Sequence, residues 1–116
     1  MCFNVSPRTE GPLVATEDIV CYKIVIRRGK AAQAIIYSEF VYELNQVTVV
    51  EEIKYHPDNR DGYGTIANGY HSFHKWYQAA ATYAGDLAEF IIPIGALYYK
   101  NGSQYVSNQI KMVGFI

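Results

Sequence analysis

The stretch that decides the fold class is Asp18-Ile-Val-Cys-Tyr-Lys-Ile-Val-Ile-Arg-Arg28. Every second residue of this stretch, such as Val20, Tyr22 and Ile24, would lie on one face of a strand. The residues between them, such as Lys23, would lie on the other face. Alternation with a period of two and a high content of β-branched residues are typical of a strand with one buried face. The pattern therefore predicts a strand over residues 18–28.

The residues that follow this strand predict further strands. Gly29-Lys30 favours a turn, and residues 31–37 then resemble a returning strand. Residues 40–45 alternate again and residues 47–53 are β-branched, which predicts two more short strands. Residues 55–70 combine glycine, proline and Asx residues, and we expect them to form the longest loop.

A helix follows that loop. Ser72 is suited to be its N-cap, residues 73–84 are compatible with a helix, and Gly85 stands where the residue after a helix is often glycine. Phe73, Trp76 and Tyr77 fall on one side at helical spacing. The sequence therefore predicts a helix over about 73–84 whose aromatic face packs on the sheet.

The last third of the chain predicts more strands. Residues 87–94 form one, with Pro93 at its end, and residues 98–105 predict a hairpin with an Asn-Gly turn that continues to residue 116. The expected fold class is α+β, with a small, mostly antiparallel sheet of about six strands packed on one main helix. Residues 1–17 predict an extended or flexible arm, which leaves residues 18–116 as a single domain.

Composition limits the class of function. The 116 residues carry a formal net charge of -1, so charge alone gives no generic binding to nucleic acid or to an anionic membrane. The apolar runs are far shorter than the roughly 20 residues that span a bilayer. Two cysteines without a CxxC pair fit a reducing compartment, and we expect a cytoplasmic protein.

Familiar catalytic and cofactor motifs are absent. The sequence contains no GxGxxG, Walker, GxSxG or HExxH pattern and no zinc-type spacing of Cys and His. After Glu89 no Asp or Glu occurs, so the last strands offer no carboxylate as a general base. We therefore expect no catalytic residue, no metal and no cofactor.

The strongest local signal surrounds the predicted helix start. His71, Ser72, His74 and Lys75 would place hydrogen-bond donors and positive charge beside the unpaired amides of a first helical turn. Such a place favours an anion, and tyrosines could supply flat surfaces for a nucleotide base. The candidate ligand-binding residues are Lys23, Tyr70, His71, Ser72, His74, Lys75, Tyr98 and Tyr99.

Three other interpretations stay open. Ser72 can simply cap a helix whose histidines are ordinary surface groups. The uncharged, tyrosine-rich second half of the chain also suits a protein–protein inhibitor or a homodimer formed through the strand after Tyr105. Finally, His71 and His74 could cleave RNA without a metal, with Lys23 or Lys75 stabilising the phosphate.

Four segments together resemble a group of small uncharacterised proteins encoded by gut Bacteroidales and their phages. They are Glu17-Asp-Ile-Val-Cys-Tyr-Lys23, Gly69-Tyr-His-Ser-Phe73, Ile91-Ile-Pro-Ile-Gly95 with Tyr98-Tyr99, and Tyr105-Val-Ser-Asn-Gln-Ile110. The group usually has Phe where this chain has Tyr70, and Lys where this chain has Ile94. The resemblance runs from about residue 17 to residue 110.

This resemblance implies a phage or prophage accessory protein in the cytoplasm of a bacterial host. Small phage proteins of this kind often inhibit host defence, and some sequester nucleotide signals without hydrolysing them. The order of elements is also loosely similar to small ADP-ribosyltransferases, but the carboxylate such enzymes need near the final strands is absent, which predicts loss of that activity. The expected partner is a small anionic, nucleotide-like ligand or, alternatively, a host protein.

Overall fold

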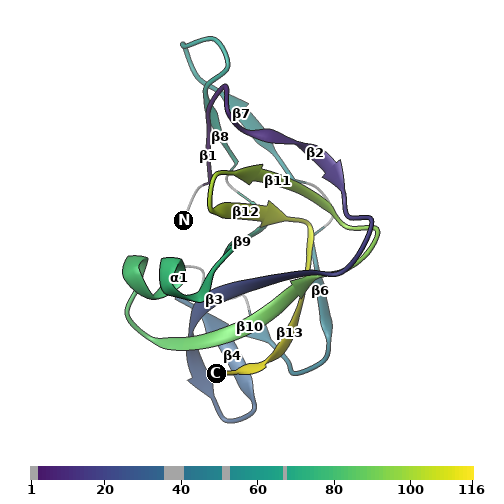
Figure 1. Cartoon of the computed structure of the whole chain (residues 1–116), viewed down its shortest axis with the longest axis vertical. Coiled ribbons are helices and arrows are strands. Elements are labelled where there is room, and N and C mark those ends of the chain that lie inside the picture. Colours follow the sequence, from purple (N-terminus) through teal and green to yellow (C-terminus); the bar gives the residue numbers. More distant parts are fainter. Residues whose placement is uncertain (1–2, 36–40, 51–52, 67) are drawn as a thin grey trace.

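The computed structural model describes residues 3–35, 41–50, 53–66 and 68–116. Within these ranges the protein is mostly β, with thirteen strands and one short helix. The prediction of an α+β fold with about six strands on one main helix is therefore wrong. The strands form a ten-stranded sheet and a three-stranded sheet, and each of their strand pairs is antiparallel (Figure 1).

The elements in chain order are β1 (Phe3–Val5), β2 (Glu10–Val14), β3 (Ile19–Arg28), β4 (Ala31–Ala34), β5 (Val41–Tyr42), β6 (Val47–Val49), β7 (Tyr55–Pro57), β8 (Gly64–Ile66), β9 (Tyr70–Phe73), α1 (Trp76–Thr82), β10 (Asp86–Ile92), β11 (Leu97–Asn101), β12 (Gln104–Ser107) and β13 (Gln109–Phe115). The large sheet has the order β2-β11-β12-β9-β3-β10-β13-β6, with β4 and β5 attached beside β3. The small sheet has the order β1-β8-β7.

Strand β3 organises the large sheet, and its prediction from the alternating sequence is confirmed. One edge pairs with β10, while the other pairs first with β9 and then with β4. β10 also pairs with β13, and a parallel bridge joins Leu44 to Met112. β4 pairs with β5, and the residues just after β5 reach β13 through this bridge, so these strands surround the main core, where Tyr42, Phe90 and Met112 are buried.

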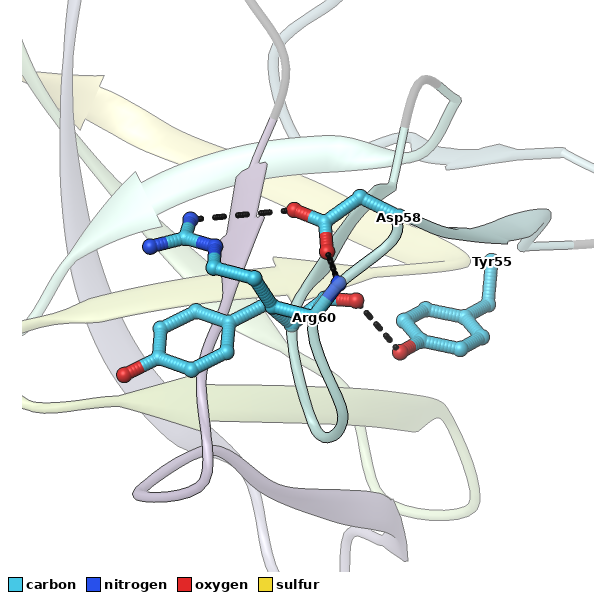
Figure 2. A network of polar contacts seen from close by, with 4 residues as sticks. Tyr55, Asp58 and Arg60 are labelled. Carbon is cyan, nitrogen blue, oxygen red and sulfur yellow. Dashed lines mark hydrogen bonds and ion pairs between the residues drawn. The ribbon is translucent and has the colours of Figure 1, made fainter.

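The predicted loop over residues 55–70 is wrong, because β7 and β8 pair as a hairpin within it. The tip of this hairpin, at residues 58–63, is a turn held by polar contacts (Figure 2). There the Asp58 carboxylate accepts from the Arg60 backbone N–H at 2.7 Å and lies 3.7 Å from its guanidinium. Tyr55 Oη donates to the Tyr63 carbonyl at 3.2 Å, and the Arg60 guanidinium lies over the Tyr63 ring. The turn chemistry is local, but the hairpin also needs β1 as a third strand.

The segment predicted as an arm contributes to both sheets. Its described part forms β1, which pairs with β8, and β2, which pairs with β11. Phe3 is buried in a small core with Ile66 and Val106, which joins the three-stranded sheet to β12 of the large sheet. The amino-terminal residues therefore supply part of the packed interior.

The helix is shorter than predicted and does not pack through its aromatic residues. It spans Trp76–Thr82, because Phe73 is part of β9 and pairs with Gln104 on β12. Within α1 the buried residue is Ala79, which packs with Ile24 and Phe73. Trp76 is 54% exposed, so the prediction that it packs on the sheet is wrong. Figure 1 shows α1 at one side of the molecule, beside β9 and β3.

The other predicted elements agree in part. The turn at residues 29–30 and the strand end at Pro93 are confirmed. The strands expected over 31–37, 40–45 and 47–53 are observed in shorter form as β4, β5 and β6, and their residues 36–37, 40 and 51–52 lie outside the described ranges. The last hairpin is confirmed as β11 and β12, and a break at Asn108 separates β12 from β13. In the described part of the chain, no helix is long and apolar enough to cross a membrane.

Candidate functional site

The structure divides the predicted site residues into separate groups. His74 and Lys75 line an open surface depression at the start of α1. Lys23, Tyr70 and Ser72 point into the interior instead, where Tyr70 and Ser72 are buried.

The depression has a volume of about 480 Å³ and is largely aromatic. Trp76 and Tyr77 supply its helical side, and their rings meet edge to face with centroids 5.7 Å apart. Both side chains are 54% exposed, so both rings are accessible from the solvent. Its full lining is Val20, Tyr22, His74, Lys75, Trp76 and Tyr77.

Local backbone contacts hold the polar side of the depression. The His74 N–H donates to the Ser103 carbonyl at 2.8 Å, which anchors the end of β9 to the β11–β12 turn. The Lys75 N–H donates to Gln78 Oε1 at 2.9 Å, so a side chain of α1 satisfies the amide that precedes the helix. These contacts fix where His74 and Lys75 project.

The electrostatic environment of the depression is mixed. Partial burial lowers the pKa of His74, and the charges of Lys75 and Lys100 lower it further. The side with these two lysines therefore favours an anion. On the other side, Glu89 of β10 is the pairing partner of Tyr22. An anionic group is thus expected near Lys75, with the aromatic rings left for an uncharged part of a ligand.

The prediction that Ser72 caps the helix is wrong. Ser72 belongs to β9 and its side chain is completely buried, so it does not cap α1. Its backbone lies in the pairing with Tyr105 of β12. α1 itself has only seven residues and begins after Lys75. Any binding at this place must therefore come from the side chains of the depression rather than from helix amides.

His71 faces a different environment from His74. Its Nε2 is 2.7 Å from Gln104 Oε1, and its ring packs edge to face against Phe3 and Phe73. His74 instead places Nδ1 3.1 Å from Tyr105 Oη, on the side of β9 that carries Ser72. The two imidazoles are therefore not brought together, as a pair that shares acid and base roles would require.

Burial lowers the pKa of His71 to about 4, and the positive charge of Lys23 adds to this effect. An unfolded histidine has a pKa near 6.5, so the unfolded chain takes up a proton before the folded protein does. We expect the free energy of unfolding to fall by about 3 kcal/mol between pH 6.5 and pH 4 on account of this residue. His71→Gln should remove most of that slope in urea titrations across this range, and an unchanged slope would show that His71 is solvated.

The two remaining candidate tyrosines lie on opposite faces of β11. Tyr98 packs edge to face on Tyr105, with centroids 6.1 Å apart, against the main core. Tyr99 packs on the small core around Phe3, close to Gly11. Neither of them lines the depression, so the predicted tyrosine surface beside the helix start is not formed by these residues.

Sequence reasoning missed four of the six residues that line the depression. Val20 and Tyr22 were assigned to a strand without a role, and Trp76 and Tyr77 were assigned to the packed face of the helix. The signal for the aromatic pair was available, because Trp76 is the only tryptophan and adjoins Lys75. Its exposure depends on how short the helix is, which the local sequence does not determine.

Two further observations bear on function. Among the described residues, no group of three or more His, Cys, Asp or Glu side chains is placed to hold a metal ion. Comparisons of the chain with protein-family models, with curated proteins and with solved structures found no match.

Proposed function

We propose that this protein is a non-catalytic binding protein that takes a small anionic, nucleotide-like ligand in the Trp76 depression. The observation that carries the proposal is the exposed pair Trp76 and Tyr77 beside Lys75 and His74 in one depression. When a flat ring stacks on an exposed tryptophan, the side chain is removed from water, which is favourable. The protein core does not have to rearrange for this to happen. In this arrangement Lys75 binds the anionic group.

The sequence resemblance supports a biological setting for this proposal. Proteins of phages and prophages that sequester a nucleotide signal need a binding surface and no catalytic group. The described site has an aromatic surface and a cation, and its two nearest histidines are held apart by β9. We therefore propose that the protein sequesters its ligand in a bacterial host and does not change it chemically.

The single tryptophan provides the experiment. Titration with adenosine monophosphate should quench and shift the fluorescence of Trp76, because the base stacks directly on its ring. Adenosine and ribose 5-phosphate should each bind more weakly than the nucleotide, since each offers only half of the contacts. A panel of cyclic and linear nucleotides then identifies the preferred ligand.

Matched variants separate the two contributions. Tyr77→Ala should weaken binding about tenfold or more, given that stacking contributes on the order of 1–3 kcal/mol per base. Lys75→Met should weaken binding of the nucleotide but should leave binding of adenosine unchanged. Tyr55→Ala serves as the control, because Tyr55 is also an exposed aromatic residue but lies on β7, outside the depression. Unaltered emission with every nucleotide would rule the proposal out.

A second candidate function is a protein–protein interaction module. It is favoured by exposed apolar residues on β2 and β11, where Val14 and Leu97 are paired and are 58% and 42% exposed. Together with the exposed Ile94 nearby in the chain, they offer an apolar surface away from α1. Light scattering coupled to size-exclusion chromatography distinguishes the two candidates: a dimer that Val14→Lys dissociates supports this one.

A further inference from the structure

Lys23, a half-buried residue between β3 and β9, turns its ammonium group inward. Lys23 Nζ donates to the His71 backbone carbonyl and lies 5.7 Å from the centroid of the Tyr42 ring. Among the described residues, no carboxylate is within ion-pair distance of it. A carbonyl and a ring face compensate a buried ammonium group only in part.

The strand that pairs with this part of β3 carries a second incompletely satisfied polar group. The pairing of Tyr22 with Phe73 places Lys23 opposite Ser72 on the next strand. Ser72 Oγ is fully buried, and no hydrogen-bond partner satisfies it among the described residues. It contacts the Cys21 thiol, which is only a weak hydrogen-bonding group, and this contact lowers the pKa of Cys21 against the larger effect of burial. Buried hydroxyl groups without a partner are rare and call for an explanation such as a bound ion.

We infer that Lys23 and Ser72 form an interior site for one small inorganic anion of halide size. The ammonium group supplies the charge and a donor, and the Ser72 hydroxyl supplies a second donor from the facing strand. A halide needs no directional geometry and is small enough to lie between two neighbouring side chains. The site is distinct from the depression, which Lys23 does not line, so the inference does not depend on the proposed function.

The groups that face Lys23 do not compete for this role. Cys21 on β3, Tyr42 on β5, Tyr70 on β9 and Tyr105 on β12 are the titratable side chains of the main core on this side. Burial raises the pKa of each of them, so all four are uncharged at neutral pH. Burial lowers the pKa of Lys23 to about 8. An anion beside the amine favours its charged form, so binding of the anion should also favour uptake of a proton by Lys23.

The test measures thermal and urea unfolding in sodium chloride against sodium gluconate at equal ionic strength, with gluconate as an anion too large for the site. In the wild-type protein, the unfolding equilibrium constant should fall tenfold for each tenfold rise in chloride once the site approaches saturation. Lys23→Met should abolish this dependence and Ser72→Ala should weaken it. Lys30→Met, which removes an exposed lysine in the β3–β4 turn, should leave it intact.

A direct readout covers the case in which a variant does not fold. Crystals of the wild-type protein soaked in bromide should show an anomalous peak in contact with Lys23 Nζ and Ser72 Oγ. The chloride dependence should also move to higher chloride concentration at pH 10, because burial lowers the pKa of Lys23 to about 8 and the anion must then bind together with a proton. Stability that is the same in chloride and gluconate, or bromide bound only at the surface, would overturn the inference.

Discussion

Phe90→Ala is expected to lower the free energy of unfolding by about 3–5 kcal/mol. Phe90 is completely buried in the main core, where its ring meets the Tyr42 ring edge to face with centroids 5.1 Å apart. It lies on β10 opposite Cys21 of β3 and Met112 of β13. Its removal therefore leaves a cavity between β3, β10 and β13, which the paired backbone of these strands cannot collapse to fill.

Trp76→Ala is the matched comparison, because a larger aromatic residue is removed from an exposed place. We expect a change of less than about 1 kcal/mol, since the ring is 54% exposed and α1 packs through Ala79. Urea titrations of both variants measure the difference. Equal losses for the two would restore the rejected arrangement, in which the helix covers the sheet with its aromatic face.

Lys23→Met is expected to stabilise the protein at pH 7 in chloride-free buffer by about 2 kcal/mol. Burial lowers the pKa of Lys23 in the folded protein to about 8, against 10.5 for the ordinary side chain. This difference lowers the free energy of unfolding by about 3 kcal/mol below pH 8. Loss of the hydrogen bond to the His71 carbonyl offsets about 1 kcal/mol of the gain. Methionine has a similar length and carries no charge.

The pH dependence separates this cause from simple repacking. Because the unfolded chain holds the lysine proton up to a higher pH than the folded protein does, wild-type stability rises from pH 8 to pH 10.5 on account of Lys23. Lys23→Met should lack that contribution, so the advantage of the variant should shrink as the pH rises through this window. An advantage that stays constant from pH 7 to pH 10.5 would mean that Lys23 is not charged and desolvated in the folded protein.

Local sequence predicted the elements that carry a clear alternation or a clear turn signal. The β3 strand and the β11–β12 hairpin follow from alternation and from turn residues such as Asn101-Gly102. The hairpin of β7 and β8 was missed, because its strands contain Pro57 and Gly64 and depend on pairing with β1 far away in the chain. Distant contacts of this kind leave no periodic signal in the segment itself.

The helix start shows the same limit at the candidate site. Ser72 and Phe73 are compatible with a helix, but pairing with β12 holds them in β9. That displacement moves the first helical residue to Trp76 and turns the aromatic residues outward. His74 and Lys75 were predicted as binding residues and do line the depression, whereas Tyr98 and Tyr99 lie elsewhere. The residue types were informative, but their grouping depended on the sheet.

The most direct test of the proposed binding site is acrylamide quenching of Trp76, the only tryptophan, with and without the nucleotide selected by the titrations. Free protein should be quenched almost as readily as the urea-unfolded chain, and saturating nucleotide should protect the ring from the quencher. Emission that resists acrylamide in the free protein, or quenching that the nucleotide leaves unchanged, would contradict a solvent-open aromatic site at the start of α1.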